Sequence, residues 1–214
     1  MYILGLTGSI GMGKTEAGKM FRRLGVPVYD ADSEVHRLFR PGGAAVGPVG
    51  KAFPGVVYNG MIDRAELGAR VFGNAEALSK LESIVHPLLE AGRHAFLARA
   101  ARGGEKVAVL DVPLLFETGA DSGCDGVAVV SAPDFVQRQR VLQRPGMSDE
   151  RLKAILERQM PDSEKRRHAD FIIPTGLDKA FALRRIAEIV RIVSSARTYV
   201  WPHGKRPPKR LAEL

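Results

Sequence analysis

Cysteine and aromatic residues are scarce in this chain, and long apolar runs are missing. The 214 residues include a single cysteine, Cys124, and Phe, Tyr and Trp together make up 7%. One cysteine excludes an intrachain disulfide and a cysteine metal cluster. No apolar run approaches the roughly 20 residues of a membrane-spanning helix, and the apolar start at 2–6 leads into a glycine-rich turn instead of a signal-peptide pattern. We therefore expect a cytoplasmic protein without a membrane partner.

Acidic residues are fewer than basic ones, which leaves a formal net charge of +8 at pH 7. Such a surplus suits a polyanionic ligand, for example a nucleotide, a phosphorylated metabolite or a nucleic acid. It fits equally well a solvated surface that carries more arginine than glutamate. Because aromatic residues are few and no nucleic-acid motif is recognised, we expect no nucleic-acid partner.

Apolar runs of strand length alternate with helical patterns along most of the sequence. The expected strands cover residues 2–6, 26–29, 107–110, 127–130 and 171–173. The expected helices cover 15–24, a segment from Asp63 in which Glu66 forms a capping box, two helices within 134–168 broken at 145–146, and 177–196. This alternation predicts a three-layer α/β fold, in which helices cover both faces of a five-stranded parallel sheet.

A phosphate-binding motif follows the first expected strand. Residues Gly8-Ser-Ile-Gly-Met-Gly-Lys-Thr15 match G-x-x-x-x-G-K-[ST], and an expected helix follows them. Gly8 and Gly13 are expected to adopt backbone angles that a side chain would forbid, so that loop N–H groups turn toward phosphate oxygens. Lys14 is expected to reach the β- and γ-phosphates, and Thr15 to offer a hydroxyl to Mg²⁺. The motif predicts a P-loop fold that uses ATP and Mg²⁺, since an incidental glycine turn explains motif and context poorly.

Two other nucleotide-binding classes lack their required residues. A dinucleotide-binding fold needs G-x-G-x-x-G, which this glycine pattern does not provide. A GTPase switch needs Asn-Lys-x-Asp, yet neither of the two asparagines, Asn59 and Asn74, precedes a lysine. A kinase is therefore favoured over a binding switch.

Three aspartates lie at the ends of expected strands, where open α/β sheets bind their ligands. Asp32 suits a base that accepts the proton of an acceptor hydroxyl, with Asp30 assisting through hydrogen bonds or water. Capping the next helix is an equally good use of either aspartate, although the preceding P-loop favours function for at least one. Asp111 suits an acid that binds Mg²⁺, and equally a turn residue ahead of Pro113.

Several segments beyond the P-loop resemble the dephospho-coenzyme A kinase family in their order and spacing. The matching pieces are Gly5–Thr15, Leu24–Asp32, Ile62–Leu67 with Val71-Phe72, His86-Pro87, Asp111–Glu117, Gln137, Arg140, Arg144, Gln159 and Ala169–Ile173. They cover residues 1–190 approximately. Each piece beyond the P-loop is weakly specific alone, whereas their order and spacing together are specific.

The resemblance implies transfer of the γ-phosphoryl group of ATP to the 3′-hydroxyl of dephospho-coenzyme A, the last step of coenzyme A synthesis. It implies one P-loop kinase domain over residues 1–196, with a helical coenzyme A-binding insertion at about 33–104 and a helical lid at about 134–168. The basic, proline-containing tail 197–214 lies outside the match, and we expect it to be mobile. We expect a monomer.

The resemblance also implies roles for individual residues. Asp32 is the implied catalytic base, with Lys14 and Arg140 in catalytic roles as well. The implied nucleotide-binding residues are Gly8, Gly11, Met12, Gly13, Lys14, Thr15, Glu16, Arg140 and Arg144. The implied substrate-binding residues are Asp30, Asp32, His86, Leu114, Leu115 and Phe116. Thr15 and Asp111 are the implied Mg²⁺ ligands.

Structural roles fit some of these residues equally well or better. His86 precedes Pro87, so a turn is as consistent with the sequence as a substrate contact. The apolar run 114–116 is more typical of a core than of a ligand site. Arg140 and Arg144 would share one helical face, where solvation is the ordinary outcome. Two like charges at this spacing repel, however, unless an anion lies between them.

The sequence departs from the family pattern at four places. Met12 stands where a small residue is usual, Glu16 where a second hydroxyl residue is common, and Ile155 where an arginine often precedes the lid glutamine. Pro174-Thr-Gly176 replaces the asparagine that often follows the last strand, which leaves the adenine contacts unassigned. The nearest alternative is another small-metabolite or nucleoside monophosphate kinase, which shares the P-loop and the lid and differs only at the acceptor site.

Overall fold

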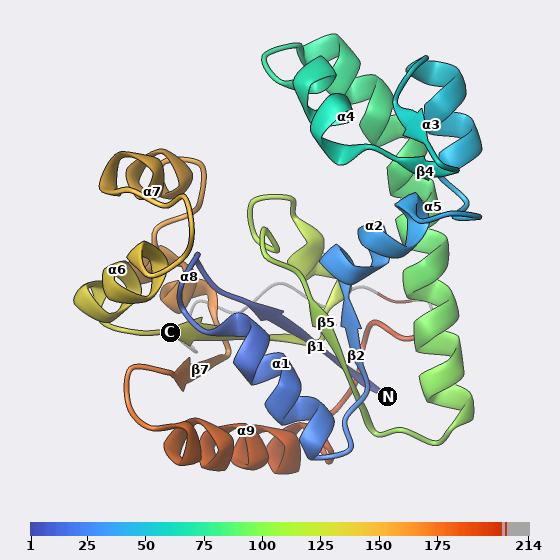
Figure 1. Ribbon diagram of the computed structural model, residues 1–214. Coiled ribbons are helices and arrows are strands. Elements are labelled where there is room, and N and C mark those ends of the chain that lie inside the picture. Colours follow the sequence, from blue (N-terminus) through green and yellow to red (C-terminus); the bar gives the residue numbers. More distant parts are fainter. Residues whose placement is uncertain (203, 205–214) are drawn as a thin grey trace. The chain divides into compact units, whose positions relative to one another are not determined.

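The structure, a computed structural model, describes residues 1–202 and 204, and they form two compact units (Figure 1). The sheet unit comprises Met1–Tyr29 and the chain from Ala100 on, whereas the inserted unit comprises Asp30–Arg99. The insertion expected at about 33–104 falls largely within the second unit. No helix of the described residues is both long and apolar enough to cross a membrane.

A five-stranded sheet is the centre of the sheet unit. Its strands are β1 (Tyr2–Thr7), β2 (Val28–Asp30), β5 (Val107–Asp111), β6 (Gly126–Ser131) and β7 (Phe171–Pro174). They lie in the order β2-β5-β1-β6-β7, and β1 pairs in parallel with both β5 and β6, as β6 does with β7. All five expected strands and the α/β fold with a parallel sheet are confirmed.

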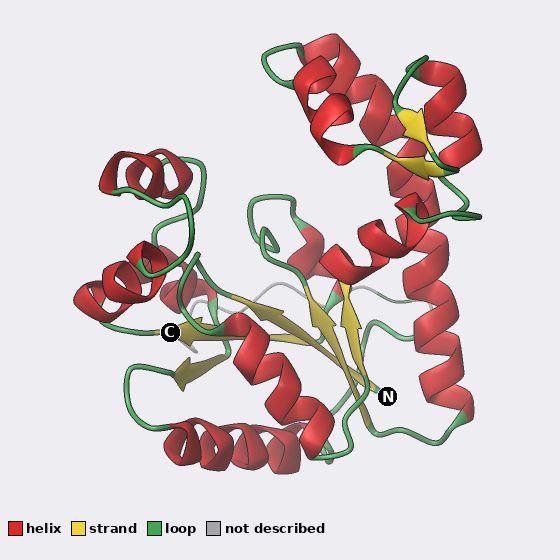
Figure 2. Cartoon of the chain, in the orientation of Figure 1, coloured by secondary structure: helices red, strands yellow, loops and turns green. Residues whose placement is uncertain are grey.

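Alternation along β1 sends Tyr2, Leu4 and Leu6 to one face of the sheet, where they join an apolar core with α1 (Lys14–Arg23) and α9 (Lys179–Val193). These two helices lie side by side beneath the strands in Figure 2. Because α1 starts directly after the loop that leaves β1, this packing also fixes the direction in which the P-loop is presented.

Three helices occupy the segment expected to hold two. They are α6 (Asp134–Leu142), α7 (Asp149–Leu156) and α8 (Asp162–His168). The break at 145–146 is confirmed, but a second break separates α7 from α8. Pro161 is the N-cap of α8 and disfavours helical backbone at the residue before it. A single helix through this point was therefore the wrong prediction.

The inserted unit is mostly helical and has an apolar core of its own. Its helices are α2 (Ala31–Phe39), α3 (Val46–Ala52), α4 (Arg64–Val71) and α5 (Ala75–Arg102), the last of which runs on into the sheet unit. A short hairpin of β3 (Val57–Tyr58) and β4 (Met61–Ile62) was not predicted. Its turn residues Asn59 and Gly60 have φ angles of 48° and 74°, and the Asn-Gly pair is the signal that would have revealed it.

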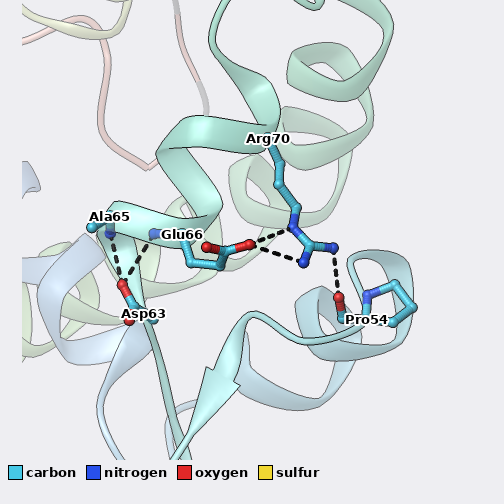
Figure 3. A network of polar contacts seen from close by, with 5 residues as sticks. All are labelled: Pro54, Asp63, Ala65, Glu66 and Arg70. Atoms are coloured by element: carbon cyan, nitrogen blue, oxygen red, sulfur yellow. Dashed lines mark hydrogen bonds and ion pairs between the residues drawn. The ribbon is translucent and has the colours of Figure 1, made fainter.

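Asp63 caps α4 as expected, but Glu66 does not complete a capping box (Figure 3). Asp63 Oδ1 accepts hydrogen bonds from the backbone N–H groups of Ala65 at 2.9 Å and Glu66 at 3.1 Å. The Glu66 carboxylate turns to Arg70 instead, and Arg70 also donates to the Pro54 carbonyl at 2.6 Å. Glu66 therefore holds Arg70, which ties α4 to the loop after α3.

The first residues of the C-terminal tail are attached to the sheet unit. The buried Asp125, which precedes β6, accepts hydrogen bonds from the backbone N–H groups of Tyr199 at 2.5 Å and Val200 at 3.0 Å, while its other oxygen accepts from Ile3. Residues 203 and 205–214 lie outside the described residues, so the expected mobility there stays a prediction.

Candidate active site

Gly8 stands where the chain leaves β1, and a side chain has no room there. A Cβ at this position would overlap Val130 Cγ2 and lie 2.8 Å from the Val130 carbonyl oxygen on β6. Positive φ angles occur instead at Gly11 (77°) and Gly13 (90°). The expected special backbone angle is confirmed for Gly13 and wrong for Gly8, which is needed for close approach to β6.

Side chains from distant segments hold the middle of the P-loop. Gln159 Oε1 accepts a hydrogen bond from Ile10 N at 3.1 Å, and Gln137 Nε2 donates to Ile10 O at 2.8 Å. The Met12 sulfur accepts from Ala132 N at 3.1 Å, and the Met12 side chain is only 1% exposed. That side chain lies in the apolar core, and the Met12 N–H donates to the Ser9 carbonyl at 3.1 Å while its carbonyl accepts from Thr175 at 2.6 Å. The predicted contact of Met12 with a nucleotide therefore stays a prediction.

Lys14, the first residue of α1, forms an ion pair with Asp111 at the end of β5. The sheet register places Asp111 opposite Leu6, one residue before β1 ends. The Lys14 Nζ atom lies 2.5 Å from Asp111 Oδ1, and the Asp111 side chain is nearly buried. The structure thus brings together the predicted phosphate-binding lysine and the predicted Mg²⁺-binding acid.

Thr15 and Glu16, the two residues after Lys14, differ in their exposure and in their contacts. Thr15 is exposed, and its hydroxyl makes no hydrogen bond among the described residues. Glu16 lies between Lys179 Nζ at 2.8 Å and Lys19 Nζ at 2.7 Å. Hydrogen bonds from Lys179 and then Lys19 lower the pKa of Glu16 to about 2. Thr15 is therefore free for a ligand, whereas Glu16 already links α1 to α9.

Arg140 on α6 contacts the P-loop, while Arg144 does not. Arg140 Nη2 donates to the Thr175 carbonyl at 2.5 Å, and its Nη1 lies 3.3 Å from the Thr175 hydroxyl and 3.5 Å from the Gly11 carbonyl. A solvated face is thus the wrong description of Arg140. Arg144 lies beyond the end of α6, so the shared helical face is also wrong, and Arg144 is exposed without a side-chain hydrogen bond in the described part of the chain.

Asp30 and Asp32 divide the roles that the sequence left open. In the inserted unit Asp30 is the N-cap of α2, and its Oδ1 accepts a hydrogen bond from Ser33 N at 2.9 Å. Asp32 lies in the first turn of α2, exposed, and its carboxylate has no hydrogen bond or ion pair within residues 1–202 and 204. The cap therefore uses Asp30, and Asp32 is the carboxylate available to a substrate.

The remaining acceptor-site candidates differ in exposure. His86 is exposed in the middle of the continuous helix α5, so the alternative of a turn at His86-Pro87 is wrong. Leu115 is 1% exposed and belongs to the core, whereas Leu114 is exposed. The half-buried Phe116 ring lies 5.7 Å from the ring of His168 on α8. Of the run 114–116, only Leu114 and Phe116 present surface to a ligand.

An ion pair of a buried lysine with a partly exposed glutamate was not predicted. The Lys165 ammonium on α8 lies 2.7 Å from Glu117 Oε1, its side chain is 0% exposed, and Met160 N donates to the same oxygen at 2.8 Å. Burial alone raises the pKa of Glu117, but the Lys165 ammonium and hydrogen bonds from backbone N–H groups outweigh it and hold this pKa below its ordinary value. Lys165 stands between Glu164 and Arg166 in the sequence, a pattern typical of a surface.

Comparison with protein families gives a match that covers the inserted unit and the sheet unit as far as the start of α9. The family model described as dephospho-CoA kinase matches residues 2–178. The dephospho-CoA kinase of Mesorhizobium japonicum is 60% identical over 176 residues, which are 82% of this chain and 88% of the relative. That of Rhodospirillum rubrum is 52% identical over 206 residues, 95% of this chain and 97% of the relative.

Solved structures agree with this match. The crystal structure of TT1252 from Thermus thermophilus superposes with a TM-score of 0.77 at 32% identity, covering 89% of this chain and 96% of the other. Dephospho-CoA kinase from Campylobacter jejuni gives a TM-score of 0.62 at 25% identity, covering 91% and 98%. On the family match, the identity to its members and the P-loop geometry together, this chain belongs to the dephospho-CoA kinase family.

Proposed function

We propose that this protein transfers the γ-phosphoryl group of ATP to the 3′-hydroxyl of dephospho-CoA, giving CoA and ADP. The observation that carries the proposal is the family match over residues 2–178, within which a P-loop lysine lies 2.5 Å from an acid at the end of the neighbouring strand. This arrangement is the one that P-loop enzymes use to bind the β- and γ-phosphates.

The P-loop is the proposed phosphate site. Positive φ angles at Gly11 and Gly13 make a loop whose N–H groups form a concave anion site, and the helix α1 adds its positive N-terminal end. Lys14 adds a full positive charge. We expect it to exchange part of its contact with Asp111 for phosphate oxygens when ATP binds.

The donor set near the P-loop fits a Mg²⁺ ion. Mg²⁺ is usually held by one or two carboxylates together with substrate phosphates, and Asp111 and the free hydroxyl of Thr15 are oxygen donors of the required kind. Among the described residues no group of three or more His, Cys, Asp or Glu is placed to hold a metal, so phosphates are needed to complete the site. When bound, Mg²⁺ neutralises charge on the β- and γ-phosphates.

Asp32 is the proposed base. Its carboxylate is exposed and makes no hydrogen bond or ion pair among the described residues, whereas the neighbouring Asp30 caps α2. A base of this kind orients the 3′-hydroxyl for in-line attack and accepts its proton, while the P-loop stabilises the charge on the transferring group. Arg140 and the exposed Arg144 are the proposed lid arginines that add positive charge over the phosphates.

The test is a transfer assay with purified protein, ATP, Mg²⁺ and dephospho-CoA, in which ADP and CoA are measured separately. AMP, adenosine and shikimate serve as competing acceptors in parallel reactions. We expect CoA to form in step with ADP and no other acceptor to support turnover. ADP formed with a different acceptor would keep the kinase and remove dephospho-CoA as its substrate.

A cytoplasmic location and a monomeric state stay predictions. Size-exclusion chromatography with light scattering, at concentrations used in the assay, measures the oligomeric state directly. We expect the molar mass of one chain at all concentrations.

A further inference from the structure

Thr175 directly follows β7, and the sheet fixes its position. Its backbone N–H donates to the Ser131 carbonyl at 2.8 Å, which continues the pairing of β7 with β6 by one residue. Thr175 thus lies beyond the carboxyl ends of β6 and of the edge strand β7. That is the edge at which open parallel sheets bind their ligands.

The Thr175 hydroxyl connects the P-loop to Arg140. It lies 2.6 Å from the Met12 carbonyl, 3.3 Å from Arg140 Nη1 and 3.3 Å from the Ser131 carbonyl. A hydroxyl has one hydrogen to donate, and its lone pairs accept. The shortest contact therefore takes the hydrogen, so that Thr175 donates to Met12 O and accepts from the guanidinium.

This hydroxyl also sets the orientation of one P-loop peptide. In a planar trans peptide the C=O and the following N–H point to opposite sides. Since the Met12 carbonyl points at Thr175, the Gly13 N–H points to the opposite side of the loop. The fit is close, because a Cβ at Gly13 would lie 3.3 Å from Thr175 Oγ1.

We propose that Thr175 is a positioning residue, whose hydroxyl fixes Arg140 and the Met12–Gly13 peptide in the orientations that bind the phosphates of ATP. The inference rests on the proposed function for its kinetic readout. Charged and peptide groups aimed in advance at the phosphates avoid reorganisation when the transition state forms. The Arg140 bond to the Thr175 carbonyl does not need the hydroxyl, so removal of the hydroxyl loosens the arginine without releasing it.

Thr175→Val tests this directly, since valine keeps the shape and removes the hydroxyl. We expect kcat/KM for ATP to fall about 5- to 30-fold, the size of one lost hydrogen bond to a charged or backbone group. KM for dephospho-CoA should stay within about twofold. Thr175→Ser restores the hydroxyl and should recover most of the loss. Thr175→Ala gives the same readout if the valine variant does not fold.

The matched control is Ser194→Ala at the end of α9. Ser194 Oγ also donates to a backbone carbonyl, that of Val190, at 2.6 Å, but it contacts neither the P-loop nor Arg140 among the described residues. It should leave kcat/KM for ATP unchanged, whatever it does to the melting temperature.

A double-mutant cycle separates positioning from a general loss of stability. In an Arg140→Ala background the added effect of Thr175→Val should be smaller than in the wild type, because part of the hydroxyl's role passes through Arg140. Full additivity, wild-type kinetics in Thr175→Val, or a serine variant as poor as valine would each overturn the proposal.

Binding of a non-hydrolysable ATP analogue, measured by calorimetry without acceptor, tests the role of Thr175 independently of the proposed substrate. A wild-type protein that binds the analogue but makes no CoA removes the proposed substrate. The weaker binding expected of Thr175→Val is still measurable in that case, and equal affinity of the two proteins would reject the role of Thr175.

Discussion

The P-loop (Gly8–Thr15) and the aspartate segment (Asp30–Asp32) hold their polar groups in different ways. Groups of the P-loop are bound by residues far away in the sequence: Ile10 by Gln137 and Gln159, and the Met12 carbonyl by Thr175. The aspartate segment is fixed by a local helix cap, in which Asp30 accepts from Ser33. Its next carboxylate, Asp32, is bound by nothing in the described chain.

The difference separates two kinds of preparation for catalysis. A phosphate site works by aiming fixed dipoles and charges at its ligand, so its backbone must be held before ATP arrives. A base must instead be free to meet the acceptor hydroxyl. Long-range tertiary bonds would give the proposed phosphate site the first property, and an exposed position in the first turn of a helix would give the proposed base the second.

Replacement of the free carboxylate should have the largest effect. We expect Asp32→Asn to lower kcat for phosphoryl transfer about 10²- to 10⁴-fold, the usual loss on removal of a general base. Steady-state kinetics measure it. Glu34→Gln is the matched control on the same helix, because Glu34 is used in an ion pair with Arg37 at 2.5 Å; it should leave kcat unchanged. Near-full turnover by Asp32→Asn would remove Asp32 as the base.

Removal of the partner of a buried charge in the sheet unit should give the largest loss of stability. Glu117→Ala leaves the wholly buried Lys165 ammonium without its carboxylate, which should cost about 3–5 kcal/mol of unfolding free energy in urea titration. Lys19→Ala removes an exposed partner of Glu16 and should cost about 0–1 kcal/mol. Equal losses in the two variants would show that burial of the pair is unimportant.

Gly8→Ala probes the packing beneath the P-loop. The added methyl group meets the Val130 side chain and backbone, so we expect a loss of about 1–3 kcal/mol in stability and weaker ATP binding. Gly68→Ala is the contrasting change in α4, where a Cβ meets no atom within 4 Å. It should stabilise the protein by about 0.5–1 kcal/mol. Stability unchanged in Gly8→Ala would contradict the close approach of the loop to β6.

Loss of a local cap should have a moderate effect. Asp63→Ala removes both hydrogen bonds to the first turn of α4 and should cost about 0.5–2 kcal/mol. Glu66→Ala removes only the pair with Arg70, so about 0.3–0.5 kcal/mol is expected. Urea unfolding of both variants measures the difference. If Glu66 mattered as much as Asp63, a reciprocal capping box would be the better description.

The smallest expected effect is a pH dependence from Glu16. Its carboxyl pKa of about 2 is below the ordinary 4.5, because Lys179 and Lys19 favour the charged form. Its contribution to stability is therefore complete above pH 4.5 and is lost as the pH falls toward 2. The stability difference between wild type and Glu16→Gln should shrink over that range, and should shrink with added salt at neutral pH because the pair is exposed. If the stability difference between wild type and Glu16→Gln grew on acidification, the pKa of Glu16 would not be lowered in the folded protein.

Strands and motifs were predictable because they depend on short stretches of sequence. Five apolar runs of strand length predicted all five strands of the sheet, and the P-loop pattern located the proposed phosphate site between β1 and α1. The predicted helices were wrong where one or two residues changed the local backbone conformation. Pro161 started a third helix in the lid segment, and Asn59-Gly60 formed a hairpin that the helical expectation missed.

By itself, the sequence determined the fold class and the family, and it located the P-loop residues of the proposed phosphate site, since hydrophobic periodicity and motif spacing are local properties. Only the tertiary structure decided how those residues are used. It assigned the helix cap to Asp30 and left Asp32 free, paired Lys14 with Asp111, turned Arg140 toward Thr175 and buried Lys165 against Glu117. Such choices depend on which distant segments the sheet order brings together, and no local pattern records that order.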